Sequence, residues 1–146
     1  MEKKYYMIIT TEKDYEIDVK NNFDIVGFPE RNKNSVKKFK KEDKIIFYVT
    51  KKSVFASVVE VIGEYFYDRK QIWSDEYDLW PHRINCKPLY IIEDVNMRVY
   101  IKDIWENLSF IKNKHKWGSQ VQGSYRILSE HDFKVIENEI VKRCNK

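Results

Sequence analysis

Several features are scarce in this chain of 146 residues, and each scarcity excludes a class of protein. The two cysteines, Cys86 and Cys144, lie far apart and outside any paired motif, which excludes a disulfide scaffold and a zinc ribbon. No apolar run approaches the roughly 20 residues of a membrane-spanning helix. The first apolar run gives way to charge at Glu12, unlike a secretory signal. We therefore expect a cytoplasmic protein that does not bind a membrane.

Residues that catalyse reactions or bind metals and phosphates lack the spacing that those tasks need. The four glycines match neither fingerprint of a nucleotide-binding loop. The three histidines, His82, His115 and His131, have no cysteine or second histidine at ligand spacing. Cys86 is predicted to be a small buried residue of a strand rather than a nucleophile. We predict no catalytic residue, no metal and no cofactor, and we favour a binding domain over an enzyme.

The chain does have enough apolar material for one folded domain over residues 1–146. Hydrophobic residues make up 42% of the sequence and aromatic residues 15%, which excludes disorder. The length fits a single domain, since domains commonly have about 100–200 residues. No repeat or low-complexity linker divides the sequence.

The first quarter of the chain predicts a strand followed by a helix. Residues 4–10 are short, aromatic and β-branched, as in a buried strand. Thr11 can cap a helix in which Asp14 takes the third position. The apolar face of this helix is predicted to hold Tyr15, Val19 and Phe23. Gly27 and Pro29 are predicted to end the unit.

The centre of the chain predicts strands and its end a helix. Residues 43–51 and 54–64 are apolar on both faces, which indicates a hairpin buried on both sides. Further strands are expected within 83–93, 98–101 and 125–128. Ser129 and Asp132 then open a helix whose Phe133, Ile136 and Ile140 point inward. The fold class is α+β, a mostly antiparallel barrel-like sheet flanked by helices.

Positive charge is concentrated in two segments. Seven of the residues 31–44 are basic and only Glu42 and Asp43 are acidic, while 107–129 contains no acid at all. If the fold brings the two segments together, they form the footprint of a polyanion-binding surface. The alternative is that the lysines of 37–41 solvate a short helix whose Val36 and Phe39 face the core.

Residues 73–83 place three large aromatic side chains, Trp73, Tyr77 and Trp80, among polar neighbours without a helical or strand period. An exposed aromatic ring in a loop can stack an unpaired base. The alternative is that a tryptophan closes the open end of the barrel.

Five segments resemble the EVE domain family, and together they span nearly the whole chain. They are YMIITT (6–11), GFPERNKN (27–34), DKIIFY (43–48), LSFIKNKHKWG (108–118) and GSYRILSEHDF (123–133). The resemblance implies a PUA-like pseudo-barrel with surrounding helices. It also implies kinship with YTH domains, which hold a methylated adenine in an aromatic cage, and with ASCH domains, some of which are hydrolases.

Carried onto this sequence, the resemblance implies a base-binding pocket. Trp73 and Trp80 fit the YTH-like spacing of a tryptophan, a polar stretch and a cage tryptophan, whereas Val26 and Gly27 stand where the second cage tryptophan is expected. Arg126 can contact a phosphate or base, or pair with an acid. The full set of predicted pocket residues is Thr10, Thr11, Trp73, Tyr77, Trp80, Trp117, Gly118, Gly123, Ser124 and Arg126.

The leading hypothesis is therefore a non-catalytic domain that binds RNA, or a modified base in DNA, with the base unpaired. The residues predicted to hold the flanking phosphates are Arg31, Lys33, Lys37, Lys38, Lys40, Lys41, Lys112, Lys114 and Lys116. The rival hypothesis is a small ASCH-like hydrolase of a modified nucleoside, for which Lys44, Glu60 and Asp103 are candidates. A third is a loop that docks on a protein partner. The sequence does not indicate an oligomeric state.

Overall fold

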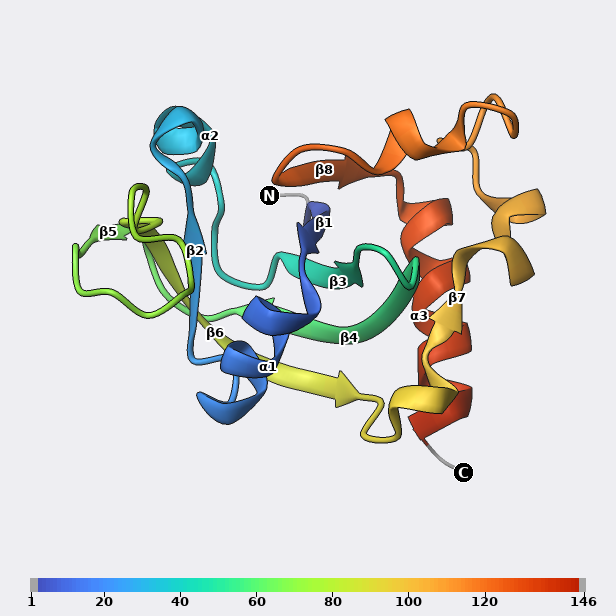
Figure 1. Cartoon of the computed structure of the whole chain (residues 1–146), viewed down its shortest axis with the longest axis horizontal. Helices are drawn as coiled ribbons and strands as arrows, with labels where there is room; N and C mark the ends of the chain where they lie inside the picture. Colours follow the sequence, from blue (N-terminus) through green and yellow to red (C-terminus); the bar gives the residue numbers. More distant parts are fainter. Residues whose placement is uncertain (1–2, 145–146) are drawn as a thin grey trace.

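The protein folds as one curled, mixed β-sheet with three helices around it, which confirms the predicted α+β class (Figure 1). This computed structural model describes residues 3–144; residues 1–2 and 145–146 of the predicted domain lie outside the described part. The strands are β1 (Tyr5–Thr10), β2 (Ile25–Phe28), β3 (Lys44–Val49), β4 (Val54–Val61), β5 (Phe66–Tyr67), β6 (His82–Ile91), β7 (Val99–Tyr100) and β8 (Tyr125–Leu128). The helices are α1 (Glu12–Lys20), α2 (Lys33–Val36) and α3 (Glu130–Cys144). Short 3₁₀ turns are η1 (Glu30–Asn32), η2 (Val95–Met97), η3 (Ile101–Asp103), η4 (Trp105–Asn107) and η5 (Trp117–Val121).

The strand order is β2-β6-β4-β3-β1-β8, with β5 paired to β6 and β7 paired to β4. β1 is parallel to β3, where Met7 lies opposite Ile46, and antiparallel to β8. A parallel pair needs a crossover connection, which the segment with α1, β2 and α2 provides. The remaining pairs are antiparallel, as the sequence predicts.

Both faces of the sheet are covered, which explains strands that are apolar on both sides. Inside the curl, Phe47 and Val59 pack with Tyr15 of α1 and Phe28 of β2. On the outer face, α3 lies across the sheet, and its Phe133, Ile136 and Ile140 pack there (Figure 1). Ser129 accepts from the Asp132 N–H at 3.1 Å, so the predicted α3 cap is confirmed.

The first helix begins as predicted but buries a different face. Thr11 Oγ1 accepts from the backbone N–H of Asp14, which caps α1. Val19 is 44% exposed, and Phe23 lies beyond the helix in a turn with a φ of 54°. The prediction that both lie on the inner helical face is therefore wrong, because that face holds Asp14 and Asp18 beside Tyr15.

Two strand boundaries also differ from the prediction. Gly27 does not end the first unit but lies within β2, opposite Arg83 of β6. β4 ends at Val61, and Ile62 beyond it is 45% exposed. Within residues 3–144, none of the helices combines the length and apolar character needed to cross a membrane.

Candidate functional site

A cavity of about 200 Å³ opens where β1 and β2 end and β8 begins. Its lining residues are Ile8, Ile9, Gly27, Pro29, Arg31, Asp75, Asp78, Trp80, Gly123 and Ser124. The structure thus brings together Trp80, Gly123, Ser124 and Arg31 from the predicted site. Wider hollows of about 520 to 620 Å³ lie elsewhere on the described surface. The cavity is smaller than the roughly 300–1,000 Å³ of sites for drug-sized ligands, so it suits a single flat ring.

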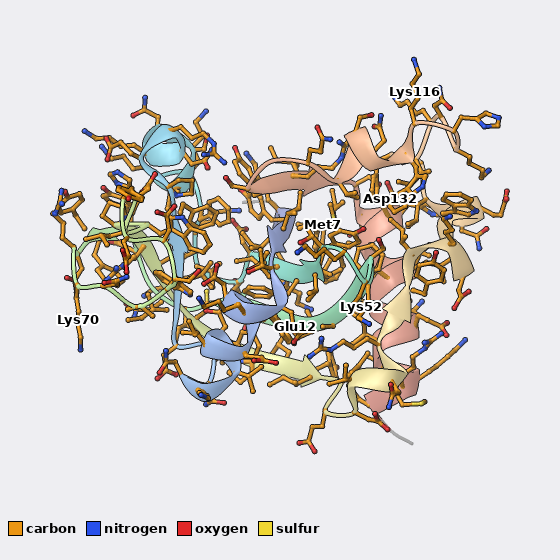
Figure 2. The ribbon with its side chains drawn as sticks, in the orientation of Figure 1. Met7, Glu12, Lys52, Lys70, Lys116 and Asp132 are labelled. Atoms are coloured by element: carbon orange, nitrogen blue, oxygen red, sulfur yellow. The ribbon has the colours of Figure 1, made fainter. Side chains whose placement is uncertain are left out.

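The loop over residues 68–81 forms one wall of the cavity, and the buried Arg83 holds it. The Arg83 Nε donates to the Trp80 carbonyl at 3.0 Å, and its Nη2 donates to the carbonyls of Leu79 and Lys70. Figure 2 shows the Lys70 side chain pointing away from the protein, so only the backbone of that residue is held. The guanidinium is fully buried and therefore acts as an internal clamp for a segment without regular structure.

Trp73 does not face the cavity. It is 4% exposed, and its indole N–H donates to Asp18 Oδ1 of α1 at 2.8 Å. The neighbouring Ser74 N–H donates to Asp14 Oδ1 at 2.9 Å, so α1 anchors the loop twice. Burial raises the pKa of Asp18 to about 7, with the charge of Asp14 adding to the rise and the Trp73 hydrogen bond opposing it. Of the two interpretations of this aromatic segment, the alternative of a buried tryptophan applies to Trp73.

Trp80 is half-buried and forms the aromatic wall. Its φ of 50° lies in the left-handed region, which costs a bulky residue roughly 1–3 kcal/mol. The backbone is held in place because Asp78 Oδ1 accepts from its N–H at 3.2 Å and Arg83 donates to its carbonyl. The Trp73 ring supports it from behind, with ring centroids 5.4 Å apart. The backbone that carries this indole is therefore held by hydrogen bonds, and the Trp73 ring packs against the indole.

Gly27 makes the close packing of this wall possible. A Cβ built on Gly27 lies 2.3 Å from the Trp73 ring and 2.9 Å from the Trp80 carbonyl oxygen. Neither contact is tolerable, so only glycine lets β2 approach the loop this closely.

Gly27→Ala is expected to lower the free energy of unfolding by about 1–3 kcal/mol, because the added methyl overpacks the wall. Urea unfolding measures the change. Gly118→Ala is the matched control, since a Cβ at Gly118 meets no atom within 4 Å. An unfolding midpoint equal to that of the control would contradict the assigned packing.

Two aspartates shape the loop tip. Asp75 Oδ1 accepts from the backbone N–H groups of Tyr77 and Asp78, at 2.9 and 3.0 Å. Asp78 Oδ2 accepts from the Glu30 N–H at 3.1 Å, which ties the tip to η1. Tyr77 lies between them and is 99% exposed, so it makes no packing contribution to the fold.

Of the basic residues of 31–41, only Arg31 lines the cavity. Its guanidinium donates to Ser124 Oγ at 2.6 Å. Lys33 and Lys38 are exposed. The remaining lysines, Lys37, Lys40 and Lys41, line a separate hollow with Phe39 and Tyr65. Lys40 is already paired with the buried Asp43 at 2.8 Å.

The second basic segment lies on the far side of β8 from α2 (Figure 1). Lys112, Lys114 and Lys116 are exposed there, and Lys114 pairs with Glu106 at 3.1 Å. Lys116 stands at the periphery of the molecule (Figure 2). Gly118 follows in η5 and is also exposed.

Besides Trp73, Tyr77 and Gly118, four more predicted pocket residues lie outside the cavity lining. Trp117 is half-buried against Trp105, with ring centroids 6.1 Å apart. Arg126 stacks on Phe110 at 5.0 Å and donates to the Gln120 carbonyl, and no described carboxylate pairs with it. Thr10 is buried and Thr11 caps α1, while the adjacent Ile8 and Ile9 line the cavity instead.

The sequence reasoning missed Asp75 and Asp78. Their signal was present, because aspartates at such spacing accept backbone hydrogen bonds in turns, and both flank the aromatic Tyr77. The residues considered for a hydrolase, Lys44, Glu60 and Asp103, do not line the cavity. Lys44 and Glu60 instead pair with Glu137 and Lys87. Across residues 3–144, no group of three or more histidine, cysteine or acidic side chains could hold a metal ion.

Comparison with solved structures shows that the fold is similar to that of YTH domains. The YTH domain-containing protein mmi1, solved as an RNA complex, superposes with a TM-score of 0.67 over 99% of this chain and 87% of that one, at 13% identity. Residues 4–139 match the model of the EVE domain, and this chain belongs to the EVE domain family. The resemblance deduced from its motifs is thereby confirmed.

Relatives of similar length occur in archaea. A UPF0310 protein of Pyrococcus abyssi is 30% identical over 145 residues, which covers 92% of this chain and 97% of that protein. A UPF0310 protein of Pyrococcus horikoshii is 30% identical over 146 residues, covering 91% and 96%.

Proposed function

We propose that this protein is a non-catalytic nucleic-acid-binding domain that takes one unpaired base into the cavity beside Trp80. The observation that carries the proposal is the half-buried indole of Trp80, backed by the Trp73 ring, on the wall of a cavity of about 200 Å³. A π-face presented in this way stacks any base. The RNA complex of the mmi1 YTH domain, which shares the fold, supports a nucleic acid as the ligand.

Charge near the cavity supports the same proposal. Arg31 stands at the cavity itself, and the exposed Lys33 and Lys38 follow on η1, α2 and the turn after it. These cations hold the phosphates on either side of the inserted base. Tyr77, fully exposed on the adjoining loop tip, provides a second ring for the neighbouring base.

An unpaired base is the expected substrate because extracting a base from a duplex costs a few kcal/mol. Single-stranded RNA, or DNA with an already displaced base, is bound in preference to a regular duplex. The choice between the two polymers depends on a contact to the 2′-hydroxyl.

Trp80→Ala is expected to weaken binding of single-stranded oligonucleotides roughly 5- to 150-fold, because one base stack contributes about 1–3 kcal/mol. Fluorescence anisotropy with labelled RNA and DNA measures this. Trp117→Ala is the control, since that indole lies outside the cavity, and its affinity should stay near wild type.

Charge removal is expected to act differently from ring removal. Lys33→Ala combined with Lys38→Ala should weaken all sequences alike and reduce the slope of log affinity against log salt by about 1.4. Affinity of the wild type that is independent of salt, or Trp80→Ala binding as tightly as wild type, would refute the proposed function.

A further inference from the structure

The cavity contains two carboxylates, Asp75 and Asp78, although a site for a polyanion is expected to be basic. A carboxylate repels phosphate, so neither residue serves the backbone of a nucleic acid. Asp75 and Asp78 line the cavity together with Trp80, so they lie beside a base that enters it. The group of the ligand that a carboxylate can contact here is therefore the polar edge of the base.

Each oxygen of Asp78 already accepts a hydrogen bond from the protein itself. Its Oδ2 accepts from the Glu30 N–H and its Oδ1 from the Trp80 N–H. It positions the loop and the indole, and both of its oxygens already have donors.

Asp75 differs because only one of its oxygens is engaged. Oδ1 accepts both hydrogen bonds from the loop, whereas Oδ2 accepts none from residues 3–144. The two backbone N–H groups, that of Asp78 first and that of Tyr77 second, lower the pKa of Asp75. The carboxylate is thus ionised at neutral pH and held through Oδ1, and it belongs to a residue that lines the cavity and whose Oδ2 accepts no hydrogen bond from the described residues.

An ionised carboxylate accepts hydrogen bonds and donates none. Cytosine, adenine and guanine each carry an exocyclic amino group that donates, whereas uracil and thymine present carbonyl oxygens at the corresponding edge. A carbonyl against the carboxylate leaves two acceptors facing each other, and a site built for a donor rejects a ring that lacks it.

We propose that Asp75 is a specificity-determining residue that makes the cavity selective for bases carrying an amino group, with cytosine bound in preference to uracil. This inference rests on the proposed function. Trp80 stacks every base alike, and Asp75 Oδ2 accepts the amino N–H of the base that fits.

The test uses short single-stranded oligonucleotides in which one central base is cytosine, uracil or 2-pyrimidinone and all other positions are abasic. The wild type is expected to bind the cytosine probe about tenfold more tightly than the uracil probe, because one charge-assisted hydrogen bond contributes about that factor in affinity. 2-Pyrimidinone is cytosine without its amino group, so it should lose most of that advantage.

Asp75→Asn is expected to bring the cytosine-to-uracil ratio close to one. Its amide oxygen can still accept the two loop N–H groups, while its amide nitrogen donates to the uracil carbonyl. Glu76→Gln removes the same charge from the next residue, which is exposed and outside the cavity lining, and should keep the wild-type ratio.

The outcomes separate the two proposals. If the wild type binds the probes but does not distinguish cytosine from uracil, the selectivity of Asp75 is refuted while base binding stands. A ratio that survives in Asp75→Asn has the same consequence. If no probe and no natural oligonucleotide binds, the proposed function itself fails.

Discussion

Asp18→Asn is expected to become more stable than the wild type as the pH rises from about 4 to 8, by up to about 4 kcal/mol. Burial raises the pKa of Asp18 from 3.8 to about 7 in the folded protein. Between these values the unfolded chain releases a proton that the folded state retains, so rising pH favours unfolding. Each unit of difference corresponds to about 1.36 kcal/mol. The asparagine has no such proton, and its amide oxygen can still accept from the Trp73 indole.

Urea unfolding of both proteins at several pH values measures this difference. Glu16→Gln is the control, because Glu16 lies on the same helix and is exposed. Equal pH dependence in Asp18→Asn and the wild type would show that the pKa of Asp18 is not raised in the folded protein. The difference between the two proteins is the quantity to compare, because the lowered pKa of Asp75 acts in the opposite direction at low pH in both of them and cancels.

Arg83→Met is expected to lower the free energy of unfolding by roughly 3–5 kcal/mol and to release the 68–81 loop. The substitution leaves the carbonyls of Lys70, Leu79 and Trp80 without their shared donor. Arg83→Lys should lose most of the same stability, because an ammonium group cannot reproduce the planar fork of a guanidinium.

Limited proteolysis provides the second readout for Arg83→Met. Cleavage within residues 68–81 should become faster under native conditions, and affinity for oligonucleotides should fall with it. Arg69→Met is the control, since Arg69 is an exposed basic residue of the same loop. A loop that resists protease as well as in the wild type would show that Arg83 is not its clamp.

The sheet was predictable because its signal is local. The double-sided apolar pattern of β3 and β4 reflects burial on both faces, and the caps at Thr11 and Ser129 depend on residues three positions away. β2 was missed because Gly27 is typical of a turn, whereas its real role is to admit the Trp73 ring from a distant segment. A contact between such distant segments produces no periodic pattern in the sequence.

The site was predictable only in part, for the same reason. Trp80 and Arg31 reach one cavity from separate segments, and the basic and aromatic composition of those segments pointed to them. Asp14 and Asp18 face inward because the Ser74 N–H and the Trp73 indole donate to them. These partners lie 60 and 55 residues away in the chain, so no local pattern indicates the contacts. Trp117 packs on Trp105 through a run of 3₁₀ turns, whose side-chain directions no simple period describes.

The position of β1 between β3 and β8 has a consequence for synthesis on the ribosome. This strand emerges early, yet one of its two neighbours, β8, is made only at residues 125–128. Until then, the backbone N–H and C=O groups along that side of β1 have no partner strand, and α3 has not yet covered the outer face. The nascent chain therefore carries an open, apolar strand edge through most of its translation, a state in which protection by a chaperone would matter.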